Sequence, residues 1–125
     1  MPAHPAELTD HPCVYFSGTA GGGNWHFYEP QKRFAVPVSG RLTCNQAATA
    51  VEATAQGIGF GLFLGYQVAS LVGAGKLQVV LAEFEPPPLP VSLVYPGARL
   101  LATRTRAFID WMAPGLRAAL DQIPV

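Results

Sequence analysis

Few residues of this chain have the types and spacing that catalysis or metal binding requires. The three histidines, His4, His11 and His26, form no H-x-x-x-H pair, and none stands beside a cysteine. Cys13 and Cys44 lie far apart and form no C-x-x-C motif, so we expect two reduced, half-buried thiols. There is no G-x-S-x-G motif, and the serines have no recognisable base partner. The sequence therefore predicts no enzyme, no metal and no other cofactor.

Two glycine patterns are similar to phosphate-binding loops but lack the setting of such loops. The run Gly21–Gly23 stands alone in a loop. The G-x-G-x-G pattern over 57–61 follows an expected helix and precedes an expected strand. A dinucleotide-binding fingerprint has the reverse order, because it follows a strand and opens a helix. We therefore expect no nucleotide site at either position.

The segment 42–45 is the one junction whose chemistry suits a ligand, because an extended run there meets a helix. A helix N-terminus offers free amide groups and a partial positive charge, which attract a carboxylate or another anion. Asn45 is also a good N-cap, whose side chain could accept hydrogen bonds from the same amides. The residues alone leave both interpretations open, an anion site or a cap with a structural role.

The elements that would position this junction alternate between strands and helices. Strands are predicted over 12–16, 34–38, 58–64, 77–81 and 91–95, with an extended lead at 41–44. Helices are predicted over 45–56 and 66–72 and in the C-terminal region. The alternation favours an α/β fold with parallel pairing. Residues 1–11 are expected to be a strand lead-in or a frayed end, and 17–24 a flexible loop.

Several residues are predicted to mark the element ends. Gly57 suits the position after the first helix, and Pro37 favours an edge strand or a bulge. Thr103 could cap the last helix, and Pro114-Gly115 should kink or interrupt it. The apolar stripe of that helix is expected to consist of Phe108, Ile109, Trp111, Met112, Leu116 and Leu120. Residues 83–90, with three consecutive prolines, are expected to form a stiff extended connector.

The overall composition is unusually apolar and uncharged. Formal net charge is zero and charged residues are 13%, against about 25% in an ordinary soluble domain. The composition therefore predicts burial against another part of the polypeptide or another copy. The uncharged run 53–75 is long enough to span a bilayer, but its six glycines argue against a membrane helix. The N-terminus has no signal-peptide pattern, so we expect a cytoplasmic protein and no membrane partner.

Motifs along the chain match one family in order and spacing. They are Pro12–Val14, Trp25-x-Phe27, Val38-x-Gly40-x-Leu42-x-x-Asn45, Ala55-x-Gly57-x-Gly59, Gly75-Lys76-Leu77-x-x-Val80-Leu81, Val94-Tyr95-Pro96 with Arg99, and Arg104-x-Arg106-Ala107-Phe108-Ile109-Asp110. From about Asp10 to Leu116, the chain resembles the C-terminal effector-binding part of LysR-type transcriptional regulators. One departure is Leu64-Gly65, where family members often carry a proline.

The resemblance implies a periplasmic-binding-protein-like type II fold, in which two α/β lobes enclose a ligand. Residues 1–89 would be the second lobe, and 90–125 a crossover strand and helix belonging to the first lobe. The winged helix-turn-helix that binds DNA is expected to be absent from this chain. The family's cleft positions correspond here to Phe16, Ser17, Thr43, Cys44, Asn45, Gly59, Phe60 and Gly61.

The resemblance also implies partners. A small anionic or aromatic effector would bind between the lobes, and DNA would be contacted only through the absent domain. Family dimers pair the first lobe of one subunit with the second lobe of the other, here through 66–72 and 77–81. We therefore expect a homodimer or a higher oligomer. The alternatives are a stand-alone solute-binding protein, a small α/β enzyme, or a truncated product that only self-associates.

Overall fold

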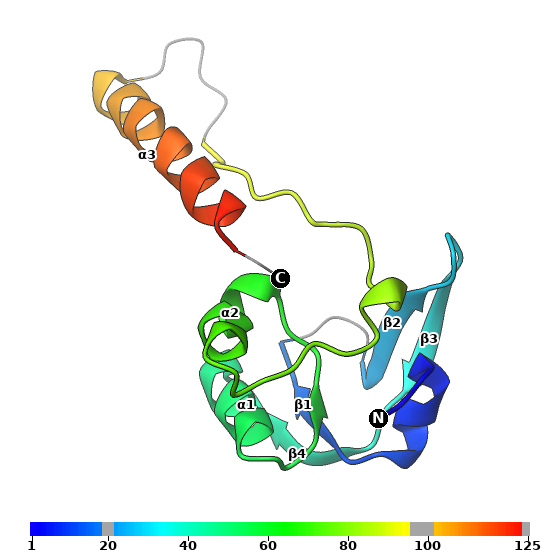
Figure 1. Cartoon of the computed structure of the whole chain (residues 1–125). Coiled ribbons are helices and arrows are strands. Elements are labelled where there is room, and N and C mark those ends of the chain that lie inside the picture. The colour runs from blue at the N-terminus through cyan, green and yellow to red at the C-terminus, as the bar shows by residue number, and fades with distance from the viewer. Residues whose placement is uncertain (19–21, 96–101, 124–125) are drawn as a thin grey trace. The chain divides into compact units, whose positions relative to one another are not determined.

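The computed structural model describes residues 1–18, 22–95 and 102–123. The chain divides into two compact units, Met1–Pro87 and Pro88–Pro124. The first unit contains the strands together with α1 and α2, and the second contains the long helix α3 (Figure 1). The candidate cleft residues named above all lie in the first unit.

A three-stranded parallel sheet forms the centre of the first unit. Its strand order is β4-β1-β5, with β1 (Cys13–Phe16) between β4 (Gly40–Cys44) and β5 (Phe60–Gly61). A separate antiparallel pair consists of β2 (Asn24–Tyr28) and β3 (Arg33–Pro37). The α/β class and the parallel pairing expected from the sequence are thus confirmed. Within this unit, α1 (Ala47–Ala55) and α2 (Gly65–Gly73) lie on one side of β1, and the β2–β3 hairpin lies on the other (Figure 1).

The central strand β1 divides the core into two clusters. Successive residues of a strand point to opposite faces of the sheet. Cys13 accordingly joins the cluster under the hairpin, and Val14 joins the cluster under α1; both are 0% exposed. Because both faces of β1 are buried, a substitution on either face would disturb the packing of one of the two clusters.

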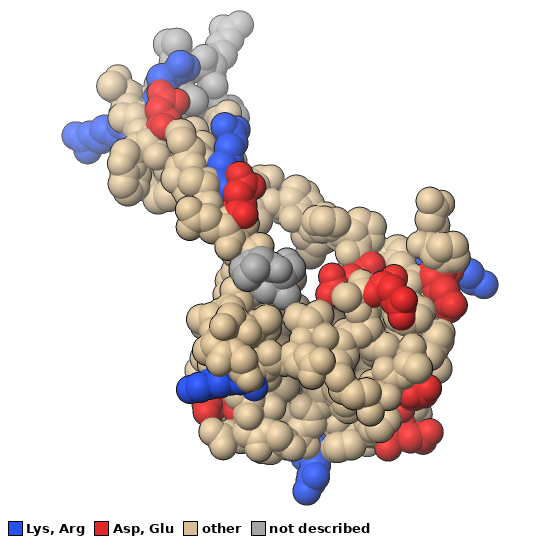
Figure 2. Space-filling view, in the orientation of Figure 1, with Lys and Arg blue, Asp and Glu red and all other residues tan. Residues whose placement is uncertain are grey.

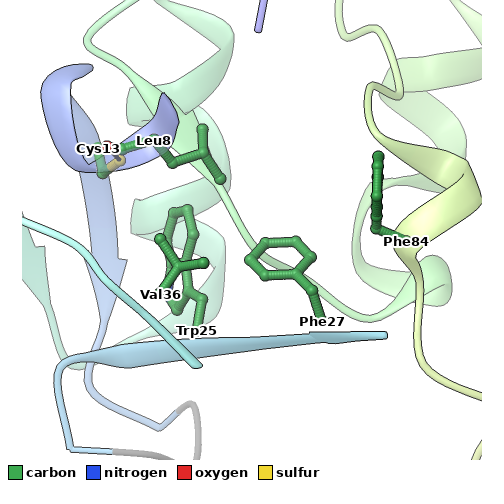
Figure 3. Packing of buried hydrophobic residues seen from close by; sticks show 6 residues of the cluster. All are labelled: Leu8, Cys13, Trp25, Phe27, Val36 and Phe84. Carbon is green, nitrogen blue, oxygen red and sulfur yellow. Dashed lines mark hydrogen bonds between the residues drawn. The ribbon is translucent and has the colours of Figure 1, made fainter. Parts of the chain in front are cut away.

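The cluster on the hairpin side is built on aromatic side chains of β2. Trp25 and Phe27 rise from the same face of this strand toward Leu8, and Phe84 closes the cluster from a different segment (Figure 3). The strand was not predicted, although the alternation Trp25-x-Phe27 is the pattern that one buried strand face requires. The Nε1 of Trp25 is buried and has no hydrogen-bond partner within the described part of the chain.

The N-terminal residues form the short 3-10 helix η1 (Pro5–Asp10), which corrects the expected strand lead-in or frayed end. His4 fixes this helix because its Nδ1 accepts from the backbone N–H of Ala6 at 3.1 Å. The other ring nitrogen lies 3.0 Å from a carboxylate oxygen of Glu29, and the ring stacks on Phe34 at a centroid distance of 5.7 Å. This histidine therefore joins η1 to the hairpin and serves a structural role.

The two helices of the first unit are α1 (Ala47–Ala55) and α2 (Gly65–Gly73). Helix α1 buries Ala50, Val51 and Ala53. Gly57 follows it with a φ of +85°, a left-handed conformation that glycine adopts without strain. The predicted role of Gly57 is thereby confirmed. The uncharged run 53–75 is divided among the end of α1, β5 and α2.

Three strand predictions were wrong in whole or in part. The segment 58–64 contains only the two-residue β5, and its side chains are half-buried or exposed. The segments 77–81 and 91–95 contain no strand. Where the segment 77–81 begins, the backbone N–H groups of Lys76 and Leu77 both donate to the carbonyl of Leu71. These hydrogen bonds join the start of the segment to α2. A strand needs a partner for its backbone groups, and no described strand pairs with either segment.

In the second unit, α3 (Thr103–Asp121) is one continuous helix that has no buried residue. The helix runs through Pro114, so the expected interruption was wrong. Thr103 is the first helical residue and not a cap; the N-cap position is Ala102. The family motif residues Pro96 and Arg99 fall outside the described residues. Among the helices within 1–18, 22–95 and 102–123, none combines the length and the apolar character that crossing a bilayer requires.

Gly57→Ala is predicted to destabilise the first unit. An added Cβ would meet no atom within 4 Å, so the cost is the left-handed backbone alone, roughly 1–2 kcal/mol of unfolding free energy. Gly73→Ala is the matched control, because Gly73 also has open space but a right-handed backbone within α2. It should be neutral or stabilising by about 0.5–1 kcal/mol. Urea unfolding of both variants tests this, and equal effects would contradict it.

Cys13 is predicted to make stability fall in mild alkali. Burial raises the pKa of the Cys13 thiol above its ordinary value, so the unfolded chain releases this proton first. The free energy of unfolding should therefore decrease as pH rises past the unfolded thiol pKa, about 8.5. Urea unfolding between pH 7 and 9.5 measures the slope. Cys13→Ala should remove part of the slope and Cys44→Ala should keep it; the reverse result would refute the assignment.

Candidate functional site

The carboxyl ends of β1 and β4 lie side by side at one edge of the parallel sheet. Phe16 is the register partner of Cys44, and the backbone N–H of Ser17 donates to the carbonyl oxygen of Cys44 at 2.8 Å. Thr43 pairs with the preceding residue of β1. In open α/β sheets, ligands bind outside the carboxyl ends of the strands. We call the set Phe16, Ser17, Thr43, Cys44 and Asn45 the carboxyl edge.

Helix α1 (Ala47–Ala55) begins directly beside this edge, and no cap hydrogen bond from a side chain is seen among the described residues. The N-cap residue is Gln46, which makes no side-chain cap hydrogen bond, so the expected cap by Asn45 was wrong. Gln46 does accept the first intrahelical bond, from the N–H of Ala50, through its carbonyl oxygen. The first turn also contains no acidic residue. The free amides and the positive end of the helix dipole are therefore available to an anion.

The side chains of the carboxyl edge are polar on the outside and apolar beneath. Ser17, Thr43 and Asn45 are exposed, and they offer two hydroxyl groups and an amide. Phe16 is half-buried, and its ring lies against Gly18, because a Cβ added there would come within 2.3 Å of the ring. Cys44 is half-buried and free. The arrangement suits reversible binding of a small molecule with an anionic and an apolar part.

The other three sequence-predicted residues lie near the opposite end of β1. Phe60 pairs with Cys13, and Gly61 pairs with Val14, two residues before the end of β1. The N–H of Phe60 donates to the carbonyl of Pro12 at 2.9 Å. The structure therefore separates 59–61 from the carboxyl edge along the strand direction.

Each of these three residues has a packing role. A Cβ on Gly59 would lie 2.4 Å from the Pro12 carbonyl oxygen, so the close approach of the two strands requires glycine. The ring of Phe60 packs edge-on against His11, with ring centroids 5.4 Å apart. A Cβ on Gly61 would meet the ring of Phe63 at 2.3 Å.

One residue that the sequence reasoning missed is Phe63. Because β5 is parallel to β1, the residues after Gly61 run toward the carboxyl edge. Phe63 and Phe16 pack against the same buried cluster of Val14, Ala50 and Ala53. Counting two residues onward from Gly61, in the direction of β1, would have found it.

Leu64-Gly65, where members of the resembled family often carry a proline, forms a hydrogen-bonded start of α2. Gly65 begins α2, and the N–H of Leu64 donates to the side-chain oxygen of Gln67 at 2.9 Å. The N–H of Gln67 in turn donates to the Leu64 carbonyl at 2.9 Å. The start of α2 is thus fixed by a reciprocal pair of hydrogen bonds that needs no proline.

A second concave feature lies between the two helices. The α1–α2 groove has a volume of about 400 Å³, and it is lined by Ala47, Ala48, Val51, Glu52, Gln67, Ser70 and Leu71. Within the part of the chain that the structure describes, no three His, Cys, Asp or Glu side chains are grouped so that they could hold a metal ion.

Comparison with known proteins identifies the relatives of this chain. It is 28% identical to the HTH-type transcriptional regulator YcaN of Escherichia coli, over 91% of the chain and 37% of that protein. It is 32% identical to an HTH-type transcriptional repressor of Pseudomonas aeruginosa, over 70% of the chain and 28% of that protein. With the regulator YhjC of Escherichia coli, identity is 30% over 96% of the chain and 41% of that protein.

The chain spans well under half the length of these curated relatives. The sequence model of the LysR substrate binding domain matches residues 1–117. Its fold is the periplasmic-binding-protein-like type II fold, in agreement with the parallel sheet and helices described above. The resemblance found in the sequence motifs is confirmed: the chain belongs to the LysR substrate-binding domain family.

Proposed function

We propose that this chain is the effector-sensing part of a LysR-type transcriptional regulator. The effector would be a small anionic or aromatic molecule held at the carboxyl edge. The observation that carries the proposal is the uncapped start of α1 beside the Ser17–Cys44 contact. An anion there would accept from the first-turn amides, while Ser17, Thr43 and Asn45 would contact its polar groups.

Within this proposal, the eight residues named from the sequence have two roles. Phe16, Ser17, Thr43, Cys44 and Asn45 would contact the effector directly. The segment 59–61 would support them, because its close packing on Pro12 and Cys13 holds the far side of β1. The enclosing wall would come from the first lobe, to which residues 90–125 are assigned in this proposal, with 1–89 as the second lobe.

The regulator as a whole would convert effector binding into a change in DNA binding. The relatives are named HTH-type transcriptional regulators, which supports DNA binding through a helix-turn-helix outside the matched region. A regulatory role without catalysis is supported by the relatives, which are named transcriptional regulators and a transcriptional repressor.

We further propose that the chain self-associates through α2 and residues 77–81. The face seen in Figure 2 is mainly uncharged, and charged side chains form small patches on it. Tyr66 on α2 is 61% exposed and Val79 is 40% exposed. Such apolar surface favours association. A single monomeric species at every concentration in sedimentation velocity would argue against this part of the proposal.

Gln46→Glu is predicted to weaken anion binding at the carboxyl edge. The new carboxylate would occupy the positive end of α1 and repel a bound anion. Backbone NMR titration with benzoate should shift the amides of 47–49 in the unchanged chain, and the apparent affinity should fall about five-fold or more in Gln46→Glu. The uncharged isostere benzamide should shift these amides much less than benzoate does.

Gln56→Glu is the matched control, since it makes the same amide-to-acid change at the other end of α1. It places a charge beside Glu52, which accepts from Gln56 at 2.9 Å, so it should lower stability by roughly 0.3–1 kcal/mol. Benzoate affinity should stay unchanged in this variant. Equal shifts with benzoate and benzamide, or equal losses of affinity in both variants, would count against an anion site at the start of α1.

A further inference from the structure

Helices α1 and α2 belong to a long stretch of sequence with a single charged side chain. Between Arg41 and Lys76, Glu52 is the only charged residue. This residue lines the α1–α2 groove, whose volume is about 400 Å³. Pockets of roughly 300–1,000 Å³ bury compact ligands, so the one charge of this stretch lies in a concavity of suitable size for a small molecule.

The groove is formed by one face of each helix. On α1 the lining positions 47 and 51, and 48 and 52, lie one turn apart, as do positions 67 and 71 on α2. Val51 is only 6% exposed and Leu71 is half-buried, so both present apolar surface within the groove. Ala47 and Ala48 are small side chains that leave space beside them. The groove therefore offers an apolar wall with one carboxylate.

The carboxylate of Glu52 is oriented but keeps its charge. Its Oε1 accepts from the side-chain amide of Gln56 at 2.9 Å, one turn further along the helix. Neither α1 nor α2 contains a basic residue, and Glu52 forms no ion pair within the described part of the chain. A carboxylate can accept about four hydrogen bonds, so it retains capacity for a cationic donor.

The polar groups of α2 in the groove favour the same kind of ligand. Ser70 is exposed and lines the groove with a hydroxyl group that can accept a hydrogen bond. The side-chain oxygen of Gln67 accepts from the backbone N–H of Leu64 at 2.9 Å, which fixes that side chain near the start of α2. An ammonium group has three donors and no acceptor, and its hydrogen bonds to a carboxylate are among the strong ones.

We propose that the α1–α2 groove is a second ligand site, which binds a small organic cation, a primary amine with an apolar part. The ammonium group contacts Glu52 and Ser70, and the apolar part lies against Val51 and Leu71. This inference goes beyond the proposed function, because the carboxyl edge is proposed to take an anion at the start of α1. The two sites therefore select opposite charges.

The size of the groove favours a small molecule over a protein partner. A stable protein interface buries about 800 Å² per partner and uses roughly 20–30 residues on each side. Seven residues line the groove. This number suits a pocket for one compact ligand with a few polar contacts.

NMR titration of the isotope-labelled full chain with benzylamine tests the proposal. The amides of 51–52 and 67–71 should shift, because these residues form the two sides of the groove. Benzyl alcohol has a similar shape without the charge, and it should bind at least about five-fold more weakly. Equal affinity for both compounds, or shifts confined to other segments, would overturn the proposal.

Glu52→Gln tests the role of the carboxylate. The affinity for benzylamine should fall about ten-fold, since the variant loses the charge but keeps an oxygen that can accept from Gln56. Glu83→Gln is the matched control, because it removes the same charge from an exposed residue of η2 (Ala82–Phe84), outside the groove. It should leave the affinity unchanged. Equal losses in both variants would show a non-specific effect of net charge and contradict the site.

Ala48→Leu tests the place of binding without changing charge. Leucine is a good helix former, and its larger side chain would fill part of the groove, so the affinity for benzylamine should fall at least about five-fold. Thr49→Leu places the same side chain on the next residue of α1, which is exposed and lies outside the groove. Its affinity should match that of the unchanged chain. Unaltered binding in Ala48→Leu would refute the groove as the place of binding.

Gln46→Glu separates this site from the carboxyl edge. The variant is expected to weaken benzoate binding, and it should bind benzylamine no more weakly than the unchanged chain does. Loss of benzylamine binding in Gln46→Glu would contradict a separate cation site. Benzylamine binding at 51–52 and 67–71 in a chain that does not bind benzoate would support the groove and count against the carboxyl edge alone.

Discussion

The packing of the first unit depends on strand β1, because this strand pairs with a neighbour on each edge and is buried on both faces. Its edges pair in parallel with β4 and β5, and its successive residues Cys13 and Val14 are fully buried in opposite clusters. The hairpin with Trp25 and Phe27 covers one face, and α1 covers the other. Fixing this strand fixes the direction of its neighbours, and therefore the place where their carboxyl ends meet.

The candidate site follows from that constraint. Residues distant in sequence, Ser17 and Cys44, come together because two parallel strands end at the same level. The start of α1 then lies beside them, since the chain passes from β4 directly into the helix. The same parallel register places Gly59 and Phe60 away from the carboxyl edge, beside Pro12 and His11. Position along a strand, more than residue type, decides which side chains share the carboxyl edge.

The parts of the fold set by local chemistry could be predicted from the sequence. Strand β1, the two helices of the first unit and the left-handed Gly57 depend on apolar pattern and on glycine, and these were found. The strand predictions at 77–81 and 91–95 were wrong because a strand needs a neighbouring strand to pair with, and residue preferences alone do not supply one. The predicted N-cap was wrong by one residue, because the N-cap is Gln46 and not Asn45; both are polar residues that could take this position. The family motifs grouped Phe16 and Ser17 with the junction at 43–45, and the strand register brings these residues together. They also grouped 59–61 with this junction, and the register separates that segment from it.

Backbone amide hydrogen exchange at Ser17, followed by NMR, tests the central claim that β1 holds β4 in register at the carboxyl edge. The account predicts that this amide, which donates to Cys44, is protected to nearly the same free energy as the buried amides of β1. Exchange of Ser17 at the rate of an exposed loop amide, with β1 itself protected, would contradict it.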